Sequence, residues 1–223
     1  MEPTKSRHFA KGHLRDHILE KLEKDIVNGK YPPGTKLTEK ALCEEFEVSR
    51  TPLREAFYML ERTGLIEIIP NKGIRVIGVS QKDIDDIYTI KGAIDGLAAR
   101  LAAERITKEE LAELKEVLDL TEFYVAKDNS EKVVEMDTRF HEIVLEAGRN
   151  RPLRQMLNTY HKLVRGARNK SLSSPERQDL MLAEHKALYE AIAAGDGELA
   201  GKLSTEHAVR ARGRIAGVMR QEE

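Results

Sequence analysis

The chain has 223 residues, 40% of them hydrophobic, and its 37 Lys+Arg and 38 Asp+Glu leave a formal net charge of −1. This length allows one large or two small domains with buried cores, and so balanced a charge gives no argument for nucleic-acid binding by itself. The single cysteine excludes an internal disulfide, no apolar run approaches the roughly 18 residues of a membrane span, and the first residues lack the apolar core of a signal peptide. We therefore expect a cytoplasmic protein with no membrane partner.

Apolar periodicity predicts three helices and a hairpin in residues 1–79. The helices are expected over residues 12–28, over 39–46 after Thr38 as N-cap, and from Ser49 to Thr63. Two β-branched runs, 65–69 and 74–77, flank a Pro-Asn-Lys-Gly turn and predict a β-hairpin. Three helices followed by a hairpin is the order of elements in a winged helix-turn-helix.

From residue 80 onward every segment has the period of a helix, and no second pair of strands is indicated. Six helices are expected, over residues 81–104, 108–126, 130–147, 152–172, 174–195 and 196–219. Short polar joints between them favour an antiparallel helical bundle. The predicted fold is thus mainly α, with a winged helix-turn-helix at 1–79 and an all-helical domain at 80–223.

Arg50 and Arg54 lie four residues apart near the start of the third predicted helix, and therefore on one face of it. This end of a recognition helix contacts base edges in the major groove, where arginine suits guanine O6 and N7. Other candidates could reach phosphates, bases or the adjacent minor groove: Lys40, Ser49, Thr51, Asn71, Lys72 and Gly73. The alternative is that the two arginines are solvated surface cations, paired with Glu47 or Glu55.

Residues 48–56, with the sequence VSRTPLREA, resemble the hallmark of the winged helix-turn-helix of the GntR family, and residues 33–37 and 60–66 match it as well. The resemblance implies that Lys40, Arg50, Arg54 and Gly73 act on operator DNA. We expect a homodimer on palindromic half-sites, because one recognition helix reads only a half-site. The apolar face of the helix over 81–104 is a candidate dimer surface, or else a core stripe. Glu47 departs from the family, where many members have glycine.

A second set of residues lies in the helical half of the chain. Asp137 and His141 are four residues apart on one helix, and His185 and His207 fall on the last two predicted helices. Three imidazoles and a carboxylate suit Zn²⁺, with Ni²⁺ or Mn²⁺ as alternatives. Spacing alone does not establish a site, because most helical histidines are exposed or satisfied by neighbours. We interpret the other histidines in that way: His8, His13, His17 and His161.

Residues 80–223 resemble the all-helical effector domain called FCD, which is found in the FadR subfamily of GntR regulators. The Asp137, His141, His185 and His207 series resembles that domain's metal-binding pattern. The resemblance implies a bound metal whose remaining positions accept water or a small carboxylate effector. The fatty-acyl-responsive branch lacks the pattern, which argues against an acyl-CoA ligand.

Residues 88–91 resemble the start of the effector domain's first helix, where an arginine usually stands at the position of Lys91. Lys91 is therefore a candidate effector contact, although lysine cannot form the bidentate fork of arginine. The alternative is a surface or ion-paired lysine near Asp95.

Three functions are compatible with these features. The first is a DNA-binding regulator, expected to be a repressor, controlled by a small organic acid at the metal site. The second is a metal sensor in which the ion itself is the signal, and the same ligands serve both roles. The third is a metal-dependent hydrolase. Against the hydrolase, no further carboxylate at catalytic spacing and no nucleophile motif accompany the ligands, so we expect a protein that is not an enzyme.

Overall fold

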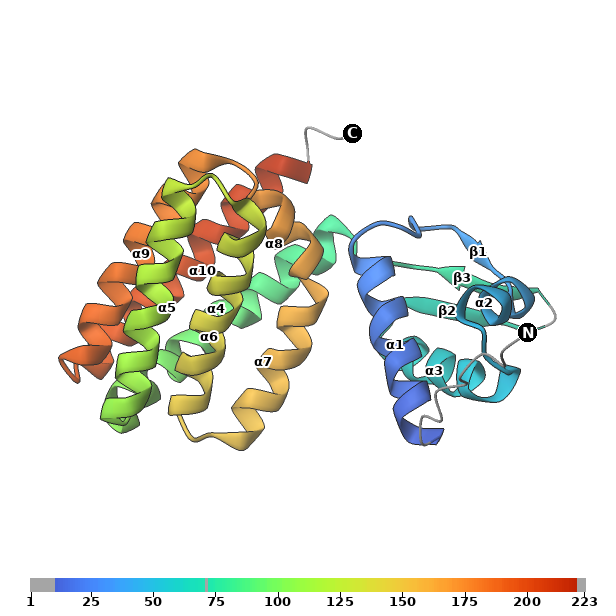
Figure 1. Cartoon of the computed structure of the whole chain (residues 1–223), viewed down its shortest axis with the longest axis horizontal. Coiled ribbons are helices and arrows are strands. Elements are labelled where there is room, and N and C mark those ends of the chain that lie inside the picture. The colour runs from blue at the N-terminus through green and yellow to red at the C-terminus, as the bar shows by residue number, and fades with distance from the viewer. Residues whose placement is uncertain (1–10, 71, 220–223) are drawn as a thin grey trace, which may run out of the picture. The chain divides into compact units, whose positions relative to one another are not determined.

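A computed structural model of the chain describes residues 11–70 and 72–219. The chain divides between Val79 and Ser80 into two compact units (Figure 1). The first unit combines helices with a small sheet, whereas the second is entirely helical over its described residues. The mainly α fold expected from the sequence is confirmed. None of the described helices has the length and apolarity needed to span a membrane.

The first unit has the order of elements of a winged helix-turn-helix. Its helices and strands are α1 (Lys11–Val27), β1 (Lys36–Leu37), α2 (Glu39–Phe46), α3 (Arg50–Arg62), β2 (Ile66–Ile69) and β3 (Gly73–Val76). The strands form an antiparallel sheet in the order β1-β3-β2, with Ile68 opposite Ile74 and Lys36 opposite Arg75. The expected hairpin is β2–β3. The two-residue strand β1 was not predicted, because it is too short to have a recognisable period.

Local signals set the bounds of α2 and α3. The Thr38 side chain accepts a hydrogen bond from the Ala41 N–H at 3.3 Å, so Thr38 caps α2 as expected. Glu47 ends α2 in the left-handed conformation, with φ 53°. Ser49 has the extended backbone of an N-cap, but its side chain makes no cap hydrogen bond to α3. The apolar stripe of α3 packs against α1 and is completely or almost completely buried: Leu53, Ala56, Phe57 and Leu60.

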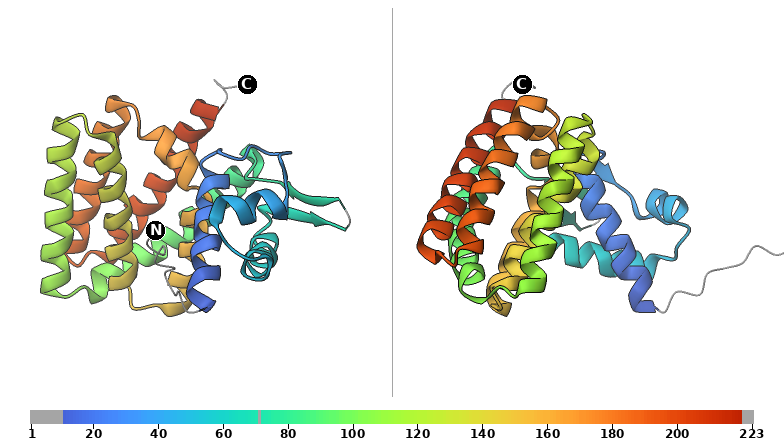
Figure 2. Two further views of the ribbon diagram at one scale, coloured as in Figure 1. Left: turned by 45° about the vertical axis from the view of Figure 1, so that its right-hand side comes forward. Right: turned by 60° about the vertical axis from the view of Figure 1, so that its left-hand side comes forward.

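The second unit is a bundle of helices (Figures 1 and 2). Its helices are α4 (Gln81–Arg105), α5 (Lys108–Ala126), α6 (Ser130–Ala147), α7 (Arg151–Leu163), α8 (Arg165–Ser171), α9 (Pro175–Ala193) and α10 (Gly197–Met219). The single helix expected over 152–172 is wrong, because the chain breaks at Val164 into α7 and α8. Gly166 follows the break, and glycine is about 1 kcal/mol less favourable than alanine in a helix.

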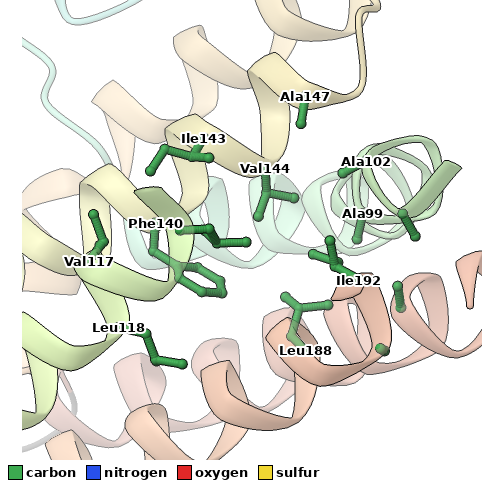
Figure 3. Close-up of a cluster of buried hydrophobic side chains, with 14 of the residues drawn as sticks. Ala99, Ala102, Val117, Leu118, Phe140, Ile143, Val144, Ala147, Leu188 and Ile192 are labelled. Atoms are coloured by element: carbon green, nitrogen blue, oxygen red, sulfur yellow. The ribbon is translucent and has the colours of Figure 1, made fainter. Parts of the chain in front are cut away.

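The apolar core of the bundle lies between α4, α5, α6 and α9 (Figure 3). The Phe140 ring of α6 is completely buried, with Leu118 of α5 and Leu188 of α9 in the same cluster. Ala99 and Ala102 keep α4 close to the other helices on this side. Because protein cores are packed as tightly as organic crystals, this cluster holds α6 and α9 in fixed positions. Both of these helices contribute to the site described below.

Helices α4 and α10 pack together through small residues. A Cβ atom at Gly96 of α4 would clash with Thr205 Oγ1 and lie 2.9 Å from the Gly201 carbonyl oxygen of α10. The Thr205 hydroxyl lies between the Gly92 carbonyl oxygen of α4, at 3.1 Å, and the Gly201 carbonyl oxygen of its own helix, at 3.0 Å, and can donate to either. Only glycine therefore fits at position 96.

Candidate DNA-binding surface and metal site

The first candidate site is the exposed side of α3 together with the hairpin tip. Because Leu53, Ala56, Phe57 and Leu60 turn toward the core, Arg50 and Arg54 are left on the exposed side of the helix. The other candidate DNA contacts within the described residues are also exposed: Lys40, Ser49, Thr51, Lys72 and Gly73. Asn71 lies outside the described residues.

Arg54 does not pair with Glu47 or Glu55. Its Nε donates to Glu39 Oε1 at 2.6 Å and its Nη2 donates to Glu39 Oε2 at 2.9 Å. These hydrogen bonds hold the pKa of the Glu39 carboxyl below its usual value. Sequence reasoning missed Glu39, because it lies fifteen residues away on α2 and nothing in the local spacing points to it.

The backbone conformation of the hairpin tip requires glycine at position 73. This residue has φ 96°, a conformation that favours glycine, and a Cβ atom there would lie 3.3 Å from the Leu37 carbonyl oxygen of β1. The Lys72 N–H donates to the Ile69 carbonyl at 3.0 Å and closes the turn. Gly73 thus has a structural reason to be present, and Lys72 is the exposed cation beside it.

The second candidate site brings together three histidines from three helices. His141 of α6, His185 of α9 and His207 of α10 each offer a ring nitrogen, and these nitrogens lie within 4.8 Å of one another. Asp137 lies one turn before His141, and its Oδ1 is 3.7 Å from His141 Nε2 and from His185 Nε2. All four residues matched to the metal-binding pattern therefore converge on one region.

The unpartnered atoms at this site fit a divalent cation. His185 is completely buried, yet neither of its ring nitrogens has a hydrogen-bond partner among the described residues, and neither has Asp137 Oδ2. Leaving such groups unsatisfied costs roughly 1–3 kcal/mol each. Ligand atoms about 2.0–2.2 Å from Zn²⁺ are themselves separated by roughly 3–4 Å. The Asp137–histidine distances of 3.7 Å fall in this range, and the histidine nitrogens, within 4.8 Å of one another, would move closer together around an ion. The three histidines could hold a metal ion, with Asp137 as a fourth ligand.

Burial keeps two of the imidazoles in the neutral form that a metal ligand requires. Desolvation, followed by the charge of His207, lowers the pKa of His185 to about 3. Desolvation and the neighbouring His185 likewise hold the pKa of His141 well below its usual value. Both rings are therefore neutral near pH 7, which is the form that binds metals. The His185 ring also stacks on Phe140, with centroids 4.1 Å apart and an angle of 8° between the planes.

A small cavity of about 30 Å³ adjoins the site and is lined by His141, His207 and Asp137 among others. Three cationic side chains line it, and each lies beside a carboxylate. Lys91 is buried and pairs with Asp95. Arg214 donates to both oxygens of Glu184, at 2.9 and 2.8 Å.

The third cation of the cavity is Arg168 of α8. Its Nε lies 3.3 Å from Asp137 Oδ2 but makes no hydrogen bond, although its Nη2 donates to Thr138 Oγ1 at 2.6 Å. Sequence reasoning missed Arg168 because the break between α7 and α8 was not predicted. It missed Arg214 because arginines are frequent on exposed helix faces.

His161 is a further residue that was misinterpreted. It was expected to be an exposed or satisfied histidine, but its ring centroid is 5.9 Å from that of His141, and its Nε2 is buried without a hydrogen-bond partner. Leu153 and Leu157 precede it at intervals of four on α7 and are both buried. That periodicity could have placed His161 on the inner face. The positions of the His8 and His13 side chains are outside the described part of the chain, and His17 is exposed.

The first unit is a winged helix-turn-helix with exposed arginines on its third helix, and the second is a helical domain that could hold a metal. This combination defines a DNA-binding transcription regulator. Residues 14–76 match the family described as bacterial regulatory proteins, gntR family, and residues 86–210 match the FCD domain. The chain belongs to the gntR family of bacterial regulators, in the group that carries an FCD domain.

Relatives and solved structures agree with this assignment. The chain is 30% identical to the HTH-type transcriptional regulator YdhC of Bacillus subtilis, over 85% of each chain. It is 33% identical to the galactonate operon transcriptional repressor of Escherichia coli, over 83% of this chain and 89% of that one. The solved structure of McbR/YncC of E. coli has the same fold, with a TM-score of 0.75 at 23% identity, covering 94% of this chain and 99% of that one.

Proposed function

We propose that the protein is a repressor that binds double-stranded operator DNA as a homodimer and is controlled by a small carboxylate at a divalent metal site. The observation that carries the regulatory part is the convergence of Asp137 and three imidazoles, two of them buried and one half-buried, beside a cavity lined with cations. Relatives named as repressors, such as the galactonate operon repressor, support the direction of control.

For DNA binding, α3 is proposed to enter the major groove with Arg50 and Arg54 directed at base edges. Ser49, Thr51 and Lys40 are proposed to contact the backbone or bases beside them, and Lys72 and Gly73, with Asn71, the adjacent minor groove. The exposure of these side chains supports the assignment for the described residues. Arginine offers two parallel donors to guanine O6 and N7, which is worth about 1–3 kcal/mol of discrimination per contact.

For the dimer, the exposed face of α4 is the proposed contact. Of the apolar stripe expected there, Ile84 and Ile87 are buried, whereas Ile90 and Leu97 remain 44% and 46% exposed. These two residues are seven apart and therefore share one face of the helix. Palindromic operators require two copies related by a two-fold axis. Leu97→Asp should convert a dimer to a monomer in analytical ultracentrifugation, while Leu180→Asp, at a 50% exposed leucine of α9, should not.

For the metal, Zn²⁺ is the first candidate because three imidazoles and a carboxylate are borderline-soft ligands, with Ni²⁺ and Mn²⁺ as alternatives. His141, His185, His207 and Asp137 would hold it. When bound, the ion polarises and orients an anionic ligand in its open coordination positions.

An anionic effector is favoured over a metal-sensing role by the adjoining cavity. Arg168 has a buried Nε without a hydrogen-bond acceptor, so a carboxylate arriving there gains a charge-assisted bond. Lys91 also lines the cavity, but its ammonium already donates a hydrogen bond to Asp95, whereas the Arg168 Nε, although near Asp137, makes none. A volume of about 30 Å³ holds little more than water. An organic acid must therefore displace side chains of α8 or α10, and this repacking would change operator affinity.

The DNA-binding part is tested by fluorescence anisotropy on the operator upstream of the protein's own gene. Arg54→Ala should weaken specific binding by about 1–3 kcal/mol. Arg62→Ala, at an exposed arginine in the last turn of the same helix, should change it little. Equal operator affinities of the wild type and Arg54→Ala would show that α3 does not read the operator.

The regulatory part is tested on the metal-loaded protein with sugar acids, hydroxy acids and dicarboxylates. One of these should release operator DNA from the wild type and not from Arg168→Met. If operator binding instead follows free Zn²⁺ without any organic ligand, the ion is the signal and the proposed effector role is wrong.

A further inference from the structure

Glu184 occupies a buried position between a metal-ligand candidate and a second cation. Its side chain is only 10% exposed, and its Oε2 lies 2.7 Å from Nδ1 of His207. Arg214 of α10 binds both carboxylate oxygens, at 2.9 and 2.8 Å, so the carboxylate is fixed from two sides. Arg210 is a more distant third neighbour, with its Nη1 3.5 Å from Oε1.

This contact determines which nitrogen of His207 carries the proton. An ionised carboxylate can only accept hydrogen bonds, so the Nδ1 of His207 must donate. In a neutral imidazole the other nitrogen, Nε2, is then unprotonated and has a free lone pair. A lone pair is what a metal requires of a histidine ligand.

The other two histidines are held differently. His185 has no hydrogen-bond partner at either nitrogen among the described residues, and its ring is fixed by stacking on Phe140. His141 is placed by its position on α6 one turn after Asp137. Within the described part of the chain, His207 is the ligand candidate whose ring is bound through its second nitrogen by a carboxylate.

We propose that Glu184 is a positioning residue, which holds His207 in the Nδ1–H form so that Nε2 faces the metal. This inference rests on the metal site proposed above. Partners of this kind orient histidine ligands and raise their basicity, and their loss typically weakens metal binding about 10–100-fold. Arg214 in turn fixes Glu184 and lines the cavity, so the effector cavity and the metal ligand share a neighbour.

The first test measures Zn²⁺ affinity by competition with a chromophoric chelator at pH 7. Glu184→Ala should weaken binding about 10–100-fold, and Glu184→Gln, which keeps an acceptor but loses the charge, should weaken it less. The matched control is Glu110→Gln. Glu110 also accepts two hydrogen bonds from one arginine, Arg149, at 2.6 and 2.9 Å, but touches no histidine in the described residues. This control should bind Zn²⁺ as the wild type does.

The second test reads the tautomer directly by ¹⁵N NMR of the His207 ring in chelator-treated protein, with His207→Gln giving the assignment. The wild type should carry the proton on Nδ1. In Glu184→Ala the fraction of His207 in this tautomer should fall. A proton on Nε2 in the wild type overturns the proposal without a Glu184 variant having to fold. Zn²⁺ binding by Glu184→Ala that equals the wild type also overturns it. A wild-type chain that binds no divalent cation overturns the metal site itself.

Discussion

Arg54 of α3 and Glu39 of α2 are joined by two hydrogen bonds that occupy one edge of the guanidinium group, Nε and Nη2. The other edge, with Nη1, remains available to a base. Glu39 therefore orients Arg54 and, in the proposed complex, would also place a negative charge near the DNA. Glu39→Ala should tighten binding to non-specific DNA, because a repulsive charge is lost, and should leave operator binding no tighter, because Arg54 is no longer oriented.

The ratio of specific to non-specific affinity should consequently fall severalfold. Anisotropy titrations of operator and scrambled duplexes at one salt concentration give this ratio. Glu55→Ala removes the same charge from an exposed position of α3 and serves as control. An unchanged ratio in Glu39→Ala would show that the ion pair has no part in recognition.

Glu47 lies between α2 and α3, the proposed recognition helix, in a backbone conformation that residues other than glycine rarely adopt. Its φ of 53° and ψ of 43° lie in the left-handed region, where a non-glycine residue costs about 1–2 kcal/mol. Glu47→Gly should therefore stabilise the protein by about 0.5–1 kcal/mol, once the greater freedom of glycine in the unfolded chain is subtracted. Urea unfolding measures the change. A less stable Glu47→Gly would mean that the Glu47 side chain makes a favourable contact that outweighs the strain.

The stability of the metal-free protein should depend on pH through the buried imidazoles. The pKa of His185 is about 3 in the folded chain, against about 6.5 in an unfolded one. Between these values the unfolded chain binds more protons, so the free energy of unfolding falls as the pH is lowered through this window. His141, with a pKa that is also lowered, acts in the same direction.

From pH 7.5 to 5.5 the loss from His185 should be about 1 kcal/mol. Urea unfolding at several pH values in the presence of a chelator measures it. His185→Gln removes one titrating group and should flatten the curve. A free energy of unfolding that is constant down to pH 5.5 contradicts the prediction.

Metal removal should destabilise the helical unit. The proposed ligands come from α6, α9 and α10, so an ion bound to the folded chain has no equivalent site in the unfolded one. At a free Zn²⁺ concentration 100 times the Kd, the stabilisation should be about 2.7 kcal/mol. Thermal unfolding with Zn²⁺ and with EDTA tests this. His185→Gln should lose most of the difference, and a wild type that melts at the same temperature in both buffers would speak against the site.

Elements with strong local signals were predicted well. The bounds of α5 follow from the capping box of Thr107 and Glu110, and those of α2 from Thr38 and the turn after Phe46. The break at Val164 was missed, because the apolar period continues across it and the single glycine at 166 does not by itself end a helix.

The candidate site, like the fold, was predicted only in part. The metal-ligand candidates were identified from a resemblance to a family pattern, and the structure brings them together. Glu39, Glu184 and Arg168 act through contacts with residues on other helices. Charged residues of this kind are frequent throughout the sequence, and the contacts that single out these three exist only once the chain has folded.

The close packing of Gly96 against α10 has a mechanical consequence. At Gly96 the two helices touch at backbone level, so a shift of one helix along the other would bring side chains into contact with backbone. His207 lies on α10, and α4 begins two residues after the DNA-binding unit ends. A displacement of α10 that carries His207 should therefore move α4 as well, the helix whose N-terminus is connected to the DNA-binding unit.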